Sequence, residues 1–138
     1  MACDSHPRPA VVTILIVDDE PHVVELVRVT LEDQWVNVEA AGDGAGALQK
    51  AHTFSPALIL LDVQLPDVSG LEVCRRLRGD PKVAASKIVM LTAAAQEDDV
   101  ARGLAAGADH YLTKPFSPVK LLSLVEALVR LQVASRDR

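Results

Sequence analysis

Hydrophobic residues follow two alternating patterns along the chain. Short runs in which nearly every residue is apolar are typical of strands that are covered on both faces of a sheet. Between these runs, apolar residues recur every three or four positions, which indicates helices with one buried face. The predicted strands span residues 11–17, 35–40, 57–61, 87–91 and 109–113. The predicted helices span residues 21–33, 45–54, 69–79, 96–106 and 117–131.

Five strand–helix units in alternation predict an α/β fold. The expected architecture is a doubly wound (βα)5 domain, with a five-stranded parallel sheet, helices on both faces and right-handed crossovers. The apolar positions of each helix should face this sheet, and in helix 96–106 these are Val100 and Leu104. In open sheets of this kind, binding sites lie beyond the carboxyl ends of the strands. We therefore expect the functional residues at that edge.

Polar residues stand at the carboxyl ends of four predicted strands. They are Asp18, Asp19, Asp62, Thr92 and Lys114. Three carboxylates in one pocket would raise one another's pKa and destabilise the fold unless a cation neutralised them. An all-oxygen set of ligands, without His or a thiol, favours Mg²⁺, with Mn²⁺ as a substitute.

A metal ion beside a lysine and a hydroxyl group is suited to phosphoryl transfer. Lys114 would supply a positive charge, and Thr92 a hydrogen-bond donor, to the equatorial oxygens of a phosphoryl group. Asp62 is single and central, whereas Asp18 and Asp19 form a metal-binding pair. Asp62 is therefore the better candidate for a nucleophile that forms an acyl phosphate.

Each of these residues also has a simpler structural alternative. Asp19 could cap the helix that begins at Pro21, and Asp62 could belong to a turn. Thr92 could be an ordinary strand-end residue, and Lys114 a solvated surface lysine. One shared site explains their joint position at four strand ends better than four separate coincidences do.

Composition and charge limit which partners and which cellular compartment are expected. Of the 138 residues, 14 are Lys or Arg and 19 are Asp or Glu, and the net charge of −5 disfavours direct nucleic-acid binding by this domain. No apolar run is long enough to cross a bilayer and no secretory signal is present, so no membrane contact is expected. Two cysteines outside any C-x-x-C motif favour a reducing, cytoplasmic compartment.

Four segments make the chain similar to the CheY-like receiver domains of two-component response regulators: ILIVDDE, LILLDVQLPDVSG, IVMLTA and GADHYLTKPF. The resemblance implies a five-stranded parallel sheet of order 2-1-3-4-5. It also implies that an aspartate accepts a phosphoryl group from the phosphohistidine of a sensor histidine kinase, or from a phosphotransfer protein, with Mg²⁺ as cofactor. Such a domain catalyses only its own phosphorylation and dephosphorylation, so it is not expected to be an enzyme.

The length of the chain fits one domain. On the resemblance, the receiver domain would span residues 11–134. Residues 1–10 would form a disordered tail, and residues 135–138 a frayed end or the start of a linker.

Carried over to this chain, the resemblance makes Asp62 the phosphoacceptor. Asp19 would bind the metal ion directly, and Asp18 would hold it largely through water. Asp62 itself and the backbone carbonyl group of Gln64 would complete the protein ligands.

The resemblance also assigns residues that sense the phosphoryl group. Thr92 and Lys114 would bind its oxygens. Thr92 would then move toward the phosphate, and Tyr111, as the switch aromatic, would turn inward into the space vacated. Gln64 and Ala94 occupy positions that tune the attack of water on the acyl phosphate. The peptide bond between Lys114 and Pro115 is expected to be cis.

The family's signalling surface corresponds here to segments 96–107, 109–113 and 117–133. Opposite charges on neighbouring elements of this surface fit a symmetric homodimer, although an ordinary solvated face carries similar charges. The output would pass to a downstream effector or to a covalently attached output domain.

Two rival functions remain at this stage. A pseudo-receiver would share the fold and bind proteins without being phosphorylated, although all the key residue types are present. A haloacid-dehalogenase-like phosphatase also uses Asp, Mg²⁺, Thr and Lys. That class has a D-x-D motif after its first strand, where this chain has Asp18, Asp19 and Glu20.

Overall fold

The computed structural model describes the backbone of residues 12–93 and 97–136 and the side chains of residues 12–93 and 100–128. The strands are β1 (Val12–Val17), β2 (Val36–Ala41), β3 (Leu58–Asp62), β4 (Lys87–Thr92) and β5 (His110–Thr113). The helices are α1 (Pro21–Leu31), α2 (Gly44–Phe54), α3 (Gly70–Arg78), α4 (Glu97–Ala105) and α5 (Pro118–Arg136). All ten predicted elements are therefore present.

The tail predicted over residues 1–10 and the lifetime-tuning position Ala94 lie outside the described residues. The domain limits at residues 11 and 134 stay predictions. Within the described ranges, no helix combines the length and apolar character needed to cross a membrane.

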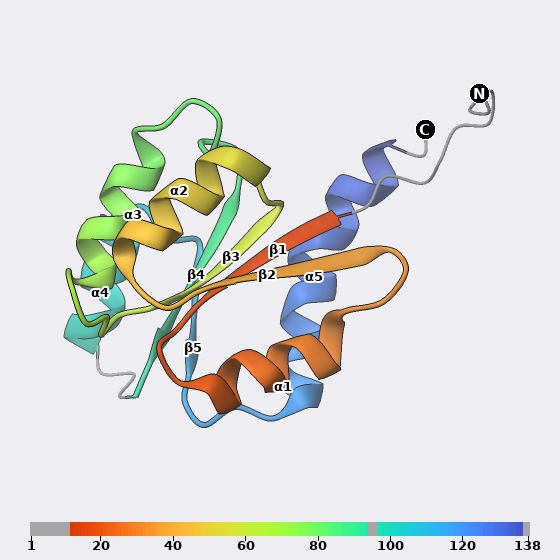
Figure 1. Cartoon of the computed structure of the whole chain (residues 1–138), viewed down its shortest axis with the longest axis horizontal. Helices are drawn as coiled ribbons and strands as arrows, with labels where there is room; N and C mark the ends of the chain where they lie inside the picture. Colours follow the sequence, from red (N-terminus) through yellow and green to blue (C-terminus); the bar gives the residue numbers. More distant parts are fainter. Residues whose placement is uncertain (1–11, 94–96, 137–138) are drawn as a thin grey trace.

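The five strands form one sheet in the order β2-β1-β3-β4-β5, and each neighbouring pair is parallel. This order confirms the predicted (βα)5 fold. Figure 1 shows α1 and α5 on one face of the sheet, and α2, α3 and α4 on the other. Because all five strands run in the same direction, their carboxyl ends meet at one edge of the sheet.

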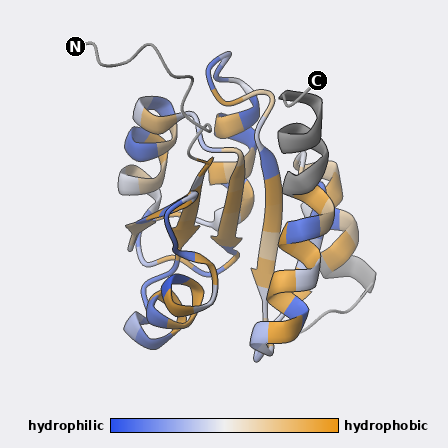
Figure 2. Ribbon diagram, turned by 90° about the vertical axis from the view of Figure 1, so that its right-hand side faces the viewer, coloured by the Kyte–Doolittle hydropathy of each residue, from blue (hydrophilic) through white to orange (hydrophobic). Residues whose placement is uncertain are grey.

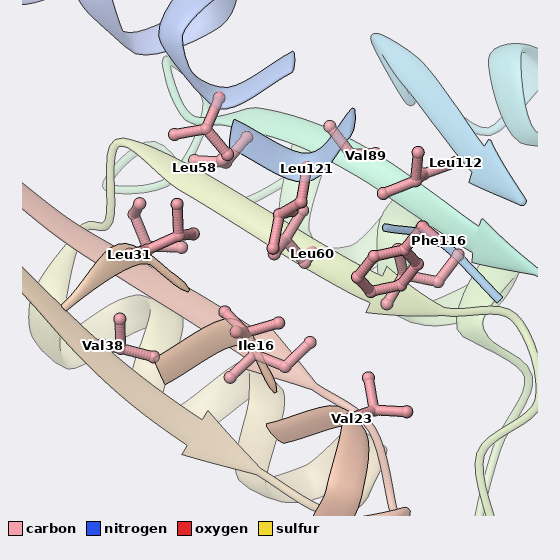
Figure 3. Packing of buried hydrophobic residues seen from close by; sticks show 14 of the residues in the cluster. Ile16, Val23, Leu31, Val38, Leu58, Leu60, Val89, Leu112, Phe116 and Leu121 are labelled. Carbon is pink, nitrogen blue, oxygen red and sulfur yellow. The ribbon is translucent and has the colours of Figure 1, made fainter. Parts of the chain in front are cut away.

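Alternate residues of the central strands belong to two separate hydrophobic clusters. In β1, Ile14 and Ile16 pack in the cluster with α1 and α5, whereas Leu15 and Val17 pack in the cluster with α2 and α3. Figure 3 shows the first cluster, in which Leu121 of α5 lies over the sheet. In Figure 2 the strands are mostly hydrophobic (orange), whereas hydrophilic segments (blue) lie in the helices and loops. Burial on both faces explains why β1 and β3 show no alternation of polar residues.

The helical face of α4 differs from the prediction. The periodicity predicts that Leu104 faces the sheet, and this is wrong, because Leu104 is 49% exposed. Gly103 is buried instead, and a Cβ atom added there would lie 3.3 Å from Cγ of Met90 on β4. Because Gly103 has no side chain, this part of α4 can lie against Met90 of β4, while the neighbouring Leu104 is exposed.

Arg78, the last residue of α3, joins three segments near the amino ends of β4 and β5. Its guanidinium group donates hydrogen bonds to the backbone carbonyl oxygens of Ala84, Ser86 and Gly107 and to Oδ2 of Asp109, the last at 2.6 Å. The same carboxylate oxygen accepts a backbone N–H of β4 at 2.8 Å. The loops before β4 and β5 are thus held in place by one side chain.

Replacing Arg78 by Met should lower the free energy of unfolding by about 2 kcal/mol, because Met keeps an apolar stem but removes the charged donor from four acceptors. Urea unfolding followed by circular dichroism measures this difference. The matched control is Arg76→Met on the same helix, where the side chain is 56% exposed and pairs with Glu72. That variant should lose only about 0.5 kcal/mol. Equal losses in the two variants would contradict the role given to Arg78.

Candidate functional site

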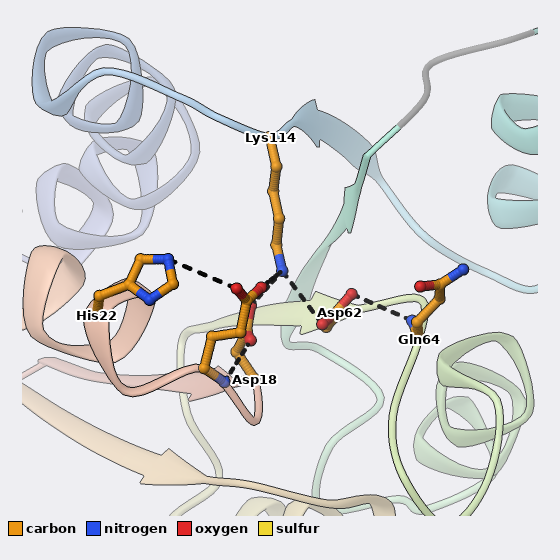
Figure 4. A network of polar contacts seen from close by, with 6 residues as sticks. Asp18, His22, Asp62, Gln64 and Lys114 are labelled. Atoms are coloured by element: carbon orange, nitrogen blue, oxygen red, sulfur yellow. Dashed lines mark hydrogen bonds and ion pairs between the residues drawn. The ribbon is translucent and has the colours of Figure 1, made fainter.

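The carboxyl edge of the sheet brings together the five polar residues singled out from the sequence. Asp18 and Lys114 follow β1 and β5 directly, whereas Asp62 and Thr92 are the last residues of β3 and β4. Figure 4 shows Asp18, Asp62 and Lys114 pointing toward one another. A carboxylate oxygen of Asp19 lies close to those of Asp18 and Asp62, and Thr92 lines the same pocket as Lys114.

Lys114 is the cationic centre of this cluster. Its Nζ lies 2.6 Å from Oδ2 of Asp18 and 3.2 Å from Oδ2 of Asp62. A third carboxylate, that of Glu20, places Oε1 3.2 Å from the same ammonium nitrogen. The Lys114 side chain is only 16% exposed, so these contacts lie in a partly desolvated environment in which ionic interactions are strengthened.

Backbone groups orient the two buried carboxylates. Oδ1 of Asp18 accepts the backbone N–H of Glu20 at 2.9 Å, and Oδ1 of Asp62 accepts the backbone N–H of Gln64 at 3.1 Å. Each carboxylate therefore has one oxygen held by the backbone and the other directed at Lys114.

Burial, nearby charges and hydrogen bonds all shift the pKa values of Asp62 and Lys114. Burial raises the pKa of the Asp62 carboxyl group, and the charge of Asp18 raises it further, whereas the N–H of Gln64 and the charge of Lys114 lower it without full compensation. Burial lowers the pKa of Lys114, but its hydrogen bond with Asp18 and the nearby carboxylate charges raise that pKa above its ordinary value. Lys114 is therefore protonated at neutral pH, and ionised Asp62 carries a free-energy cost that a bound cation would reduce.

The carboxylates have the arrangement of a metal site. One oxygen each from Asp18, Asp19 and Asp62 lies within 4.8 Å of the others. An open pocket of about 540 Å³ lies beside them and is lined also by Thr92 and Lys114. The donors are carboxylate oxygens, which are the ligands that hard divalent cations prefer. The residues present therefore fit a divalent cation such as Mg²⁺.

The loop that follows Asp62 is fixed at both ends. Gly70 donates its backbone N–H to the carbonyl oxygen of Val63 at 2.8 Å, and a Cβ atom added at Gly70 would lie 2.1 Å from the carbonyl oxygen of Asp62. Farther along the loop, the carboxylate of Asp67 accepts the first two backbone N–H groups of α2 at 2.8 and 3.1 Å. These bonds lower the pKa of Asp67. The loop is thereby joined to α2 as well as to β3.

Tyr111 lies on β5 beside β4, and the residue is 44% exposed. An apolar cavity of about 10 Å³ is lined by Tyr111, Thr92 and Val63. This cavity is smaller than an aromatic ring, so an inward turn of Tyr111 requires its walls to move. The peptide bond between Lys114 and Pro115 is cis, as the resemblance implies.

Sequence reasoning missed two residues of this site. The contact of Glu20 with Lys114 was signalled only by its place directly after Asp18 and Asp19, and the bridge from Asp67 to α2 had no sequence signal. The capping alternative for Asp19 is wrong, because the N-cap of α1 is Glu20, which forms no side-chain capping bond.

Comparison with known families decides the class of the protein. The family model described as the response regulator receiver domain matches residues 14–126. The chain belongs to this family. The receiver domain is thus a signalling module of two-component response regulators, and it carries its acidic pocket where such domains are phosphorylated. The phosphatase alternative does not fit this membership.

Individual relatives agree with the assignment. The receiver domain is 47% identical over 117 residues to the alkaline phosphatase synthesis transcriptional regulatory protein PhoP of Bacillus subtilis, a match covering 85% of this chain and 48% of PhoP. The chemotaxis protein CheY4 of Vibrio cholerae superposes with a TM-score of 0.81 at 34% identity, covering 86% of this chain and 99% of CheY4. The BeF3-activated receiver domain of DrrB, an OmpR/PhoB homologue of Thermotoga maritima, superposes at 0.79 and 32% identity, covering 87% and 98%. The chain spans about half the length of the curated relatives it matches.

Proposed function

We propose that the receiver domain accepts a phosphoryl group on Asp62 and acts as a phosphorylation-dependent switch. The observation that carries this proposal is the meeting of three carboxylates and the ammonium group of Lys114 beside an open pocket. Asp62 is the acceptor because it is the buried acid that lines this pocket. The solved BeF3-activated form of the DrrB receiver domain supports phosphoryl-like ligation in this family.

The transfer is a nucleophilic displacement at phosphorus. A carboxylate oxygen of Asp62 forms a new bond to the phosphorus of a phosphohistidine while the phosphorus–nitrogen bond breaks. The bonding electron pair leaves with the imidazole nitrogen, and Asp62 becomes an acyl phosphate. The phosphodonor in this reaction would be a sensor histidine kinase or a phosphotransfer protein.

The surrounding residues hold the reacting groups. Asp18, Asp19, Asp62 and the backbone carbonyl group of Gln64 would bind Mg²⁺, or Mn²⁺ in its place. The ion would neutralise negative charge on the phosphoryl oxygens. Lys114, already 3.2 Å from Asp62, would bind another of those oxygens.

Thr92 and Tyr111 would convert phosphorylation into a change of surface. Thr92 would move toward the phosphoryl group, and Tyr111 would turn into the space beside it. The small cavity that both residues line, together with the exposure of Tyr111, supports this coupling. Phosphorylation would act by shifting the population between two conformations.

The output surface of this switch would be α4, β5 and α5. Exposed apolar side chains on these elements support the assignment: Leu104, Tyr111, Val119 and Leu122. The partner would be a second copy of the domain, a separate effector or a covalently attached output domain. PhoP is a regulator of transcription and MtrA a DNA-binding response regulator, and each is about twice as long as the matched region. An attached output domain that contacts DNA therefore fits best, and the protein would then act in the cytoplasm.

Incubation with acetyl phosphate and Mg²⁺ tests the proposed function. Intact-protein mass spectrometry should detect one added phosphoryl group, and peptide mapping after borohydride reduction should place it on Asp62. Omitting Mg²⁺ should suppress the adduct, since the carboxylates would then repel an anionic donor. If no adduct forms on the folded protein, the pseudo-receiver alternative is favoured.

Mg²⁺ at millimolar concentration should raise the melting temperature of the unphosphorylated protein, because the ion binds the folded pocket and not the unfolded chain. A concentration ten times the dissociation constant contributes about 1.4 kcal/mol of stability. Differential scanning calorimetry with and without Mg²⁺ measures the effect. Asp19→Asn should reduce it, whereas Asp33→Asn, at the opposite end of the sheet, should leave it unchanged. An unchanged melt of the parent protein would exclude the metal site.

A further inference from the structure

Glu20 holds a position in the pocket that the phosphoryl-transfer scheme does not use. Its Oε1 lies 3.2 Å from Nζ of Lys114, and its Oε2 lies 3.5 Å from Nε2 of His22. The side chain is 47% exposed and lines the mouth of the open pocket. Asp18 and Asp62, the other carboxylates on Lys114, have side chains that are only 0% and 9% exposed.

Hydrogen bonds hold the backbone of Glu20 in place, and two side-chain contacts orient its carboxylate. The N–H of Glu20 donates to Oδ1 of Asp18, and its carbonyl oxygen accepts the N–H groups of Val23 and Val24 in the first turn of α1. His22, on the same turn, contacts the second carboxylate oxygen. The side chain therefore reaches Lys114 from an anchored position.

Three carboxylates already surround the ammonium group of Lys114 in this arrangement. A lysine ammonium group has three donors, and three carboxylates lie within 3.2 Å of it. Phosphoryl oxygens on Asp62 would compete with the remaining carboxylates, Asp18 and Glu20, for Lys114. Glu20 is the most exposed of the three, so water can solvate its released carboxylate at the lowest cost.

We propose that Glu20 is a positioning residue that holds Lys114 in the unphosphorylated state and slows phosphorylation by small anionic donors. This inference rests on the proposed function of Asp62. Glu20 acts by competing with the incoming phosphoryl oxygens for Lys114 and by placing negative charge at the mouth through which an anionic donor enters. It takes no part in bond making or breaking.

The test compares phosphorylation rates of the parent chain and Glu20→Gln, with acetyl phosphate as donor and Mg²⁺ saturating for each protein. In this reaction Asp62 displaces acetate from phosphorus, and acetate carries away the electron pair of the broken bond. Glu20→Gln keeps the size of the side chain and removes its charge. Its rate should rise about two- to five-fold, the range expected for a partly exposed ionic contact.

A matched variant controls for net charge. Glu25→Gln changes the same charge one turn farther along α1, where Glu25 is exposed and forms no ion pair with any described side chain. Its rate should equal that of the parent protein. The dependence of the phosphorylation rate on ionic strength is a further test, because a purely structural role of Glu20 would not change it. Salt should accelerate the parent protein by screening the repulsion, and should accelerate Glu20→Gln less.

Three results would overturn the inference: an unchanged or slower rate in Glu20→Gln, an equal acceleration in Glu25→Gln, or the same salt dependence in Glu20→Gln and the parent protein. Failure of the proposed function itself is distinguishable, because the parent protein would then form no adduct at any rate.

Discussion

Replacing Asp62 by Asn should abolish phosphorylation by acetyl phosphate while leaving the receiver domain folded. The amide cannot form an acyl phosphate, but its oxygen can still accept the N–H of Gln64. Lys114 keeps its contacts with Asp18 and Glu20. Intact-protein mass spectrometry should show no adduct under conditions that fully modify the parent protein. Asp33→Asn, an exposed carboxylate at the amino end of β2, is the control and should be phosphorylated normally.

Asp62→Asn should also raise the melting temperature of the protein at neutral pH when no Mg²⁺ is present. The pKa of Asp62 is raised in the folded protein, so its ionised form destabilises the fold above that pKa, and neutral Asn removes this cost. A gain of about 1 kcal/mol corresponds to roughly 3 °C in a domain of this size. The gain should disappear as the pH falls below the ordinary aspartate value of 3.8, since Asp62 is then protonated in both the folded and the unfolded chain. A destabilised Asp62→Asn at neutral pH would contradict the electrostatic description.

Replacing Gly70 by Ala should destabilise the protein more than any surface substitution. The new Cβ would lie 2.1 Å from the carbonyl oxygen of Asp62 and 2.9 Å from Cα of Val63. Both are backbone atoms and cannot rotate away, so the start of α3 must separate from the end of β3. We expect a loss of about 3 kcal/mol, which lowers the melting temperature by roughly 10 °C.

Gly70→Ala should also weaken Mg²⁺ binding, because it displaces the end of β3, which carries Asp62. Thermal melts with and without Mg²⁺ measure both effects on the same samples. Gly42→Ala is the matched control, since a Cβ there has no atom within 4 Å, and its stability should change by less than about 0.5 kcal/mol. A Gly70→Ala protein that melts like Gly42→Ala would show that the loop can relax.

Much of the fold follows from local pattern. The apolar runs of β1 and β3 and the helical spacing of apolar residues in α1 and α3 identify these elements, because each pattern matches the burial of one element against the sheet. The prediction is wrong for Leu104, because α4 packs against the sheet through Gly103. Apolar periodicity alone does not distinguish a large residue that faces outward from one that faces the sheet.

The site was partly predictable for a geometric reason. Parallel strands end at a common edge, so acids directly after strands are expected to meet there, as Asp18 and Asp62 do. The third carboxylate on Lys114 was not predictable, because Glu20 lies beyond the strand end and its direction depends on how α1 begins.

The sequence by itself determined the order of strands and helices, the family, and which residue types stand at the strand ends, because these depend on neighbours along the chain. Only the tertiary structure decided which side chains share Lys114, how closely Gly70 approaches β3, and which loops Arg78 joins. These contacts join residues up to 94 positions apart, as Glu20 and Lys114 are. Their distances depend on how strands and helices pack in three dimensions, and no local pattern encodes that packing.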